Sequence, residues 1–278
     1  ASFESVDVAF FAAGEQITAE WAGRATAAGA TVIDLSQLYA AEPDVPLVIP
    51  EINAEAVGEH AVRGIIASPD PAALQLAVVL RPLQVEAGLK RVVVASYQPV
   101  SELGRAGIEE LSQQTVALLS GRDVEVRTFP QRVAFNILPQ AGQFLAAGYT
   151  RGEQLLIEQT RRLLGNPALA ITATSVRVPV FYGLSQSVNV ETEQPLAAAD
   201  ARALLGRAAG VLVEDDPSNG TYPSPMTAVG TDAICVGRIR DDDSTAAAIN
   251  LWICGDNLRR GAAVNAVAIA EILVREYL

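Results

Sequence analysis

The sequence contains few of the side chains that most often carry catalysis. Its 278 residues include two cysteines and one histidine, and 5% of them are aromatic. Cys235 and Cys254 lie inside apolar runs, which predicts buried thiols in a reducing compartment. His60 lies in a polar stretch and is expected at the surface. A Cys–His catalytic pair needs both side chains in one pocket, so this chain offers few candidates for one.

Long apolar segments and positive charge are also scarce. No apolar run approaches the roughly 20 residues that a transmembrane helix needs. The first residues, Ala1–Glu4, lack the basic region that opens a signal peptide. The formal net charge is −12, and no basic stripe with aromatic residues occurs, which disfavours nucleic acid and anionic membranes as partners. We therefore expect a cytoplasmic protein that binds neither.

The common catalytic and metal-binding motifs are absent from the sequence. It contains no GxSxG, HExxH, CxxC or Walker pattern. Asp241–Asp243 form an acidic cluster in a predicted loop, without a histidine or a fixed ligand spacing beside it. We interpret this cluster as a solvated turn and predict no metal site.

The composition and hydrophobic pattern indicate a well-packed α/β protein. Hydrophobic residues make up 50% of the chain, enough for a sizeable core. Val6–Ala12 is predicted as a buried strand, Thr18 as the cap of a helix that ends at Gly29, and Thr31–Ser36 as the next strand. This strand–helix–strand order is typical of a parallel, doubly wound sheet.

The turn Ser68-Pro69-Asp70-Pro71 is the most informative stretch. It follows a strand end at Ile65–Ile66 and precedes residues with apolar helical spacing up to Pro82. Asp70 suits the helix N-cap, and Pro71 suits the first helical position, which needs no N–H. A thiol at that position would be stabilised as a thiolate by the helix N-terminus, but proline is inert. The alternative is an ordinary capped turn with no role in function.

The remainder of the chain predicts an α+β region. Its expected strands are Lys90–Val100, Val176–Tyr182, Ser187–Glu193, Ala233–Ile239 and Ala247–Cys254, and its expected helices are Gly107–Gly121, Gly152–Gly165, Ala197–Ala209 and Arg259–Tyr277. The alternation in VNVETE predicts that Ser187–Glu193 is half-exposed.

Several blocks resemble one enzyme family, in that family's order. They are Val45–Asn53, Ser96–Ser101, Val133–Gln140, Ser175–Gly183, Val236–Asp242 and Ile249–Glu271. With these blocks, the chain is similar to aspartate-semialdehyde dehydrogenases. The resemblance implies a Rossmann-like, doubly wound NADP-binding domain, formed by residues 1–72 and 256–278, and an α+β dimerisation and catalytic domain over 73–255. It also implies a homodimer.

The family's glycine-rich phosphate turn has no counterpart here. A dinucleotide-binding domain normally opens with a strand, such a turn and a helix, and the family has Gly-x-x-Gly-x-x-Gly near its start. No such pattern precedes Val6. We therefore expect that this chain lacks the first βαβ unit of the cofactor domain.

The resemblance implies that two catalytic side chains have been replaced. Pro71 stands where the family has its nucleophilic cysteine, and Leu184 stands where it has its acid/base histidine. Two site residues match. Gln98 matches a residue that helps place the nucleophile, although a structural glutamine is an equal alternative. Arg177 matches the arginine whose guanidinium clamps the substrate carboxylate, and an ordinary ion pair within the chain is the less favoured alternative.

Positions for substrate and phosphate are altered as well. The family's Glu-x-x-Lys pair corresponds to Gln159 and Arg162, or to Glu158 and Arg161 if the alignment slips by one residue. A phosphate-binding arginine of the family corresponds to Ala40. The implied substrate-binding residues are therefore Arg177, Gln159 and Arg162.

The implied NADP contacts are partly retained. They are the turn Ala13–Gly14, the loop Ser101–Gly104 and Asn257. In the loop, Glu102 replaces a glycine of the family's Ser-Gly-x-Gly and adds bulk and negative charge. The resemblance thus implies NADP as the cofactor, although one of the contact positions, Glu102, holds a different residue from that of the family.

Together these replacements favour an inactive member of the family, similar to its cysteine-less Usg-type paralogues. Its role would be structural, regulatory or ligand-sensing, and a small carboxylate is the expected ligand. The alternative is an active NAD(P)-dependent oxidoreductase that acts on another aldehyde or acyl substrate without a thioacyl intermediate. A third possibility is a partner of a true dehydrogenase through a shared dimer surface.

Overall fold

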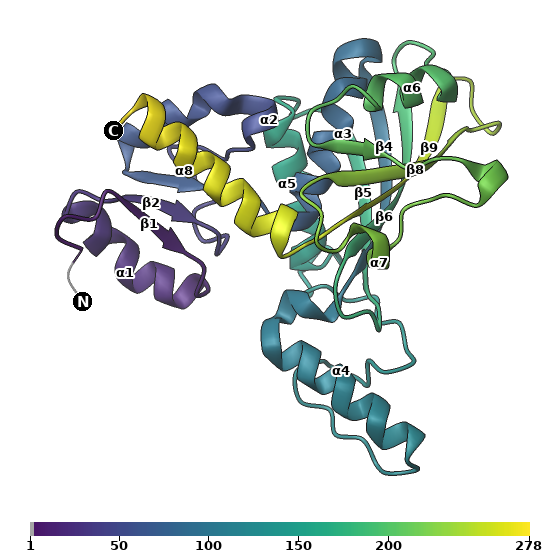
Figure 1. The fold of residues 1–278 in the computed structure, drawn as a ribbon, viewed down its shortest axis with the longest axis horizontal. Helices are drawn as coiled ribbons and strands as arrows, with labels where there is room; N and C mark the ends of the chain where they lie inside the picture. Colours follow the sequence, from purple (N-terminus) through teal and green to yellow (C-terminus); the bar gives the residue numbers. More distant parts are fainter. Residues whose placement is uncertain (1–2) are drawn as a thin grey trace.

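The computed structural model describes residues 3–278 and shows two lobes, each built on its own sheet (Figure 1). The first lobe holds three parallel strands in the order β1-β2-β3, and the first two are joined by helix α1. Their bounds are β1 Val8–Phe11, α1 Glu15–Ala27, β2 Thr31–Asp34 and β3 Ile65–Ala67. The predicted parallel sheet is confirmed.

The start of α1 differs from the prediction. The helix begins at Glu15 with Gly14 as its N-cap, and Thr18 is buried inside it instead of capping it. Strand β1 is also less buried than expected, because it lies at the edge of the three-stranded sheet, and the Phe10 side chain is 50% exposed.

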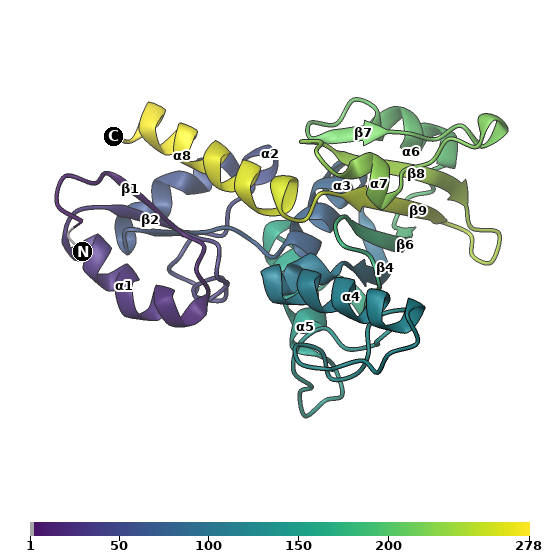
Figure 2. The same cartoon turned by 60° about the horizontal axis from the view of Figure 1, so that its bottom comes forward.

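The C-terminal helix returns to the first lobe. A π-helical turn, Arg259–Val264, leads into α8, Asn265–Glu276, where a single long helix was predicted. Helix α8 runs from the second lobe onto the three-stranded sheet (Figure 2). Ile269 and Leu273 of α8 pack there against Ile33 and Ile66 of the sheet. The first lobe is therefore completed by the end of the chain.

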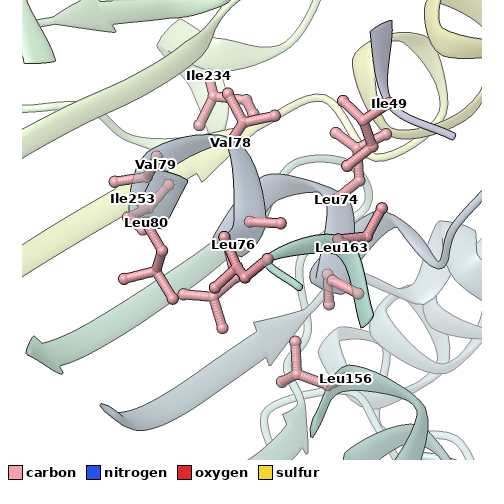
Figure 3. Packing of buried hydrophobic residues seen from close by; sticks show 14 of the residues in the cluster. Ile49, Leu74, Leu76, Val78, Val79, Leu80, Leu156, Leu163, Ile234 and Ile253 are labelled. Carbon is pink, nitrogen blue, oxygen red and sulfur yellow. The ribbon is translucent and has the colours of Figure 1, made fainter. Parts of the chain in front are cut away.

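Helix α3, Pro71–Ala87, forms the centre of the second lobe. Its side chains from Ala72 to Leu80 are all buried, and Figure 3 shows Leu74, Leu76 and Leu80 among residues of neighbouring strands and helices. The helix was predicted only as far as Pro82. It continues because burial of Leu83 and Ala87 offsets the one helical N–H that the proline lacks.

The second sheet has six strands in the order β5-β4-β6-β9-β8-β7. The outer pairs β4–β5 and β7–β8 are parallel, and the remaining pairs are antiparallel. The strands are β4 Leu89–Gln98, β5 Ala170–Arg177, β6 Leu184–Thr192, β7 Val211–Val213, β8 Ile234–Asp241 and β9 Ala248–Gly255. The predicted strand at Val176–Tyr182 is wrong: β5 ends at Arg177, since Pro179 cannot donate a ladder hydrogen bond.

The two faces of the six-stranded sheet differ. Helices α3, α5 (Arg151–Leu163) and α6 (Ala198–Leu205) contact its strands and bury one face. On the other face, Ala95, Ser187 and Trp252 lie side by side on three neighbouring strands and are half-buried. The predicted half-exposed alternation along β6 is confirmed. We call this second face the open face; Trp252 Nε1 donates there to the Pro223 carbonyl at 3.0 Å, just before the short helix α7 (Pro225–Ala228).

The remaining helices are short or peripheral. They are α2 Pro50–Asn53, the 3₁₀ segments Ala54–Val62, Val100–Leu103 and Pro217–Asn219, α4 Gly104–Leu119 and α7 Pro225–Ala228. Helix α4 projects away from both sheets as an arm (Figure 1). Leu111 packs there against Phe129 and Val133 of the loop that follows. Within residues 3–278, none of the helices has the length and apolar character needed to span a bilayer.

Candidate functional site

The turn between β3 and α3 adopts the predicted capping geometry. Helix α3 begins at Pro71, and the Asp70 carboxylate accepts a hydrogen bond of 2.9 Å from the Ala72 N–H. The turn therefore presents the N-terminus of a buried helix, but its first helical residue is a proline. Pro71 packs closely on the π-helical turn before α8, where a Cβ added to Gly261 would lie 2.7 Å from the Pro71 Cβ.

Gln159 is fixed against this turn. Its Oε1 accepts a hydrogen bond of 2.7 Å from the Asp70 N–H, and its Nε2 donates one of 2.8 Å to Gln37 Oε1. Gln37 in turn donates to the Ser68 carbonyl at 3.2 Å. The side chain of Gln159 is 3% exposed, so its amide is used to hold the turn and not to meet solvent.

Arg162 lies one helical turn further along α5 and is also engaged within the chain. Its Nη1 donates to the Ala40 carbonyl at 2.7 Å, and its Nη2 donates to the Val45 carbonyl. Burial lowers the pKa of Arg162. The other predicted pair points elsewhere, since Arg161 donates to Leu169 and Glu158 is exposed beside Gln154. The structure thus brings Gln159 to the turn, while Arg162 binds carbonyls of the segment between β2 and α2.

Replacing Gln159 with glutamate should destabilise the protein. Gln159→Glu keeps the side-chain shape and the acceptor for the Asp70 N–H, but it removes the donor to Gln37 and places a charge in a buried site. We expect a loss of about 1–3 kcal/mol in the free energy of unfolding, the cost of an unsatisfied buried polar group. Urea denaturation measures it. Gln154→Glu, at an exposed position of α5, is the matched control, and an equal loss in both would contradict this assignment.

Arg177 is the cation of the site, at the end of β5. Its side chain is 6% exposed, and its Nη1 donates to the Pro99 carbonyl at 2.7 Å and to Glu102 Oε2 at 2.8 Å. Gln98 lies opposite it in the β4–β5 register and is buried. The guanidinium that was predicted to bind a ligand carboxylate is therefore paired with a carboxylate of the same chain.

The positive charge of Arg177 acts on the pKa values of two carboxyl groups. Burial raises the pKa of Glu102 to about 7; the Arg177 charge opposes the rise, and the Asp70 charge adds to it. Burial also raises the pKa of Asp70, against the hydrogen bonds from Ala72 and Ala73 and the charge of Arg177. The site therefore binds a proton more readily than ordinary carboxylates would.

Neither cysteine supplies a thiol to the turn. Leu184, at the start of β6, is fully buried, and Cys235 and Cys254 face one another on β8 and β9 with no exposed surface. Burial raises the pKa of Cys254 to about 12, and burial raises that of Cys235 as well. Cys254 Sγ lies 3.2 Å from the Ser185 Oγ. Both thiols are protonated and shielded at neutral pH.

The predicted cofactor residues form two separate groups. Ser101 and Asn257 are buried together: Asn257 Nδ2 donates to Ser101 Oγ at 3.1 Å, and its Oδ1 accepts from the Gly183 N–H at 3.2 Å. Gly104 begins α4 and is exposed. Ala13 and Gly14 lie in the first lobe, just before α1.

An ion pair between two distant segments of the chain lies beside the turn. Arg260, which is 2% exposed, donates from Nη2 to Glu51 Oε1 of α2 at 2.8 Å. Gly261, the next residue, is the one that packs on Pro71. This pair holds the π-helical turn against the site. Its two residues are 209 positions apart in the sequence, so no local pattern predicts their contact.

The predictions from the sequence did not include Gln37 or the ion pair of Glu102 with Arg177. A signal for Gln37 was available: it follows β2, whose carboxyl end lies beside that of β3 in a parallel sheet. His60 was predicted at the surface but is half-buried, because its ring packs edge-on against Tyr277. It lies outside the Arg177 cluster, and its Nδ1 is 2.8 Å from the Val57 carbonyl.

The acidic cluster at the end of β8 has structural partners. Asp241 accepts a hydrogen bond from the Ala198 N–H at the start of α6, and Asp242 accepts from Asn189 and Ser244. These bonds from Ser244 and Asn189 lower the pKa of Asp242. Over residues 3–278, no three His, Cys, Asp or Glu side chains gather in a way that could hold a metal ion.

The comparisons with known proteins agree on one family. Residues 80–260 match the semialdehyde dehydrogenase dimerisation domain, and residues 1–60 match the semialdehyde dehydrogenase NAD-binding domain. The aspartate-semialdehyde dehydrogenase of Aquifex aeolicus is 44% identical, over 100% of this chain and 82% of the relative. That of Legionella pneumophila is 45% identical, over 99% and 80%.

A solved structure shows the same fold. Aspartate semialdehyde dehydrogenase II from Vibrio cholerae superposes with a TM-score of 0.97 at 41% identity, over 100% of this chain and 82% of that one. A second structure of that enzyme, described as complexed with ASA, gives the same values.

Proposed function

Because the chain belongs to the aspartate-semialdehyde dehydrogenase family, we propose that it is a member that has lost the family's chemistry and keeps a structural, regulatory or ligand-sensing role. It resembles the cysteine-less Usg-type paralogues in this respect. The family itself serves amino-acid biosynthesis. The ligand of the remaining site would be a small carboxylate held by Arg177.

One observation carries the proposal: the turn at the helix N-terminus offers no nucleophile. Pro71 has no reactive group, and the thiols of Cys235 and Cys254 are buried in the sheet with raised pKa values. Leu184, at the position assigned to the histidine by resemblance, is a fully buried apolar side chain. A covalent mechanism needs a nucleophile and a base in reach of each other.

The NAD(P)-binding domain of the family is present, but the residues assigned to the cofactor fit it poorly. Ser101 and Asn257 satisfy each other, and both are almost fully buried. Glu102 adds a carboxylate to the loop and holds Arg177. We therefore assign no chemical step to NADP in this chain. The domain limits that we propose are 1–72 with 256–278, and 73–255.

We further propose a homodimer that is formed through the open face of the six-stranded sheet. The matched dimerisation domain includes this sheet. The face carries Tyr97 and Trp252, whose ring centroids are 5.5 Å apart, and a hollow of about 430 Å³ lies beside Trp252. Such a half-buried aromatic surface is typical of an interface core.

The dimer is tested by sedimentation at micromolar concentration. We expect a mass twice the 29.2 kDa of the chain. Ser187→Arg, at the centre of the open face, should give the monomer because it buries an unpaired charge in the interface. Val62→Arg, at an exposed position of the other lobe, should remain dimeric. A monomeric unmodified protein would contradict the proposal.

The alternative is an active oxidoreductase that acts on another aldehyde or acyl substrate. The retained Gln98 and Arg177 favour it, and the Glu102 carboxyl, with a pKa of about 7, is a group that could exchange protons near neutral pH. Such a reaction would have to proceed without a cysteine nucleophile and without a thioacyl intermediate.

Assay of NADP-dependent turnover separates the two functions. The substrates are aspartate semialdehyde with phosphate, and then other small aldehydes. Product formation from the first would contradict the loss of the family's reaction. Product formation from another aldehyde would support the alternative. If neither substrate gives product and the protein binds succinate, the result is the one expected of a ligand-sensing protein.

A further inference from the structure

The ion pair at the end of β5 has an unusual charge balance. Arg177 contributes one positive charge, and Glu102 and Asp70 contribute two negative charges when both are ionised. The Arg177 side chain is 6% exposed and that of Glu102 is 19% exposed, so water screens this excess weakly. An incoming carboxylate would add a further negative charge to a site that already holds too many.

The other charged groups near Glu102 do not correct this excess. Arg177 donates a hydrogen bond to it from β5, and the charge of Asp70, at the cap of α3, raises its pKa. Arg105 of α4 follows Glu102 by three residues in the sequence, but it is exposed and pairs with Glu109 and not with Glu102. Glu102 is therefore the partner that holds the guanidinium when no ligand is bound.

We propose that Glu102 is a built-in competitor for anions at Arg177, and that the site accepts a small carboxylate together with one proton, which is taken up by Glu102. This inference rests on the proposed function, since it concerns the same site. With Glu102 neutral, the site holds one positive and one negative charge. The guanidinium can then turn its fork to a ligand carboxylate, which it binds bidentately.

The sign of the pH dependence follows from this uptake. The Glu102 carboxyl titrates at about pH 7 in the free protein, and a bound anion beside it favours its protonated form further. Binding therefore takes up a proton above pH 7, and the affinity for the ligand falls as the pH rises. The loss is about 25-fold from pH 6.5 to pH 8.5 for a group with a free pKa of 7.

The experiment is a calorimetric titration of the 278-residue protein with succinate at pH values from 6.5 to 8.5. The unmodified protein should lose affinity about 25-fold across this range. Glu102→Gln, which imitates the neutral carboxyl, should bind with a pH dependence below about twofold and, at pH 8.5, at least about tenfold more tightly than the unmodified protein. Glu109→Gln makes the same charge change at an exposed position of α4 and should behave as the unmodified protein does.

Three results would overturn the proposal. They are an affinity that is flat or rises with pH in the unmodified protein, the same slope in Glu102→Gln, and no succinate binding by Glu102→Gln at any of these pH values. Carboxyl ¹³C NMR of the unmodified protein tests the proposal even if the variants do not fold. One glutamate resonance should titrate near pH 7, and titration of every glutamate below pH 5.5 would also overturn it. Turnover of aspartate semialdehyde would refute the proposed loss of activity, but it would leave this slope unaffected.

Discussion

In an assay with aspartate semialdehyde, phosphate and NADP, the protein should turn over substrate at least about 10⁴-fold more slowly than the Vibrio cholerae enzyme to which it is similar. Catalytic groups that act as a unit typically account for factors of about 10⁴ to 10⁶ in rate. Here Pro71 and Leu184 supply neither a nucleophile nor a base, and the two cysteines are fully buried. Turnover within about 100-fold of the relative would contradict the prediction.

The double variant Pro71→Cys/Leu184→His is the informative companion of this assay. It places a thiol at the N-terminus of α3, where the helix dipole favours the thiolate. We expect its rate to exceed that of the unmodified protein but to stay below that of the relative. Arg177 would still be held by Glu102, and Gln159 would still be bound to the turn. A rate equal to that of the relative would mean that these two contacts do not limit the site.

Local pattern was sufficient to predict much of the fold. The alternation along β6 and the cap of α3 depend on residues close in sequence, and the structure confirms both. The errors arose where burial or chain geometry overrides the pattern. Helix α3 passes Pro82 because Leu83 is buried beyond it, and β5 ends at Arg177 because Pro179 follows.

The sequence predicted which residues form the site, but not which of them contact one another. The resemblance indicated Arg177, Gln159 and Asn257 as site residues, and it indicated that Glu102 replaces a glycine of the family. It could not show that Glu102 closes on Arg177, 75 residues away, or that Gln159 meets Asp70 across 89 residues. Such contacts depend on how the two sheets and α3 pack together, and no periodicity of the sequence records that.

Removing the buried Arg260 should destabilise the protein far more than removing its exposed neighbour Arg259. Arg260→Met preserves length and apolar volume but leaves Glu51 without its partner in a site where Arg260 is 2% exposed. We expect the free energy of unfolding to fall by about 3 kcal/mol, at the low end for a broken buried pair. The Glu51 side chain is 26% exposed and can still reach water, which limits the cost.

The neighbouring residue supplies the control, and a double variant tests the cause. Arg259 also pairs with an acid, Asp232, but both side chains are more than half exposed, so Arg259→Met should leave the unfolding midpoint in urea unchanged. Adding Glu51→Gln to Arg260→Met removes the unpaired charge and should restore part of the stability. If both arginine variants lost the same stability, or if the second change restored none, then packing of the π-helical turn, and not charge, would account for the effect.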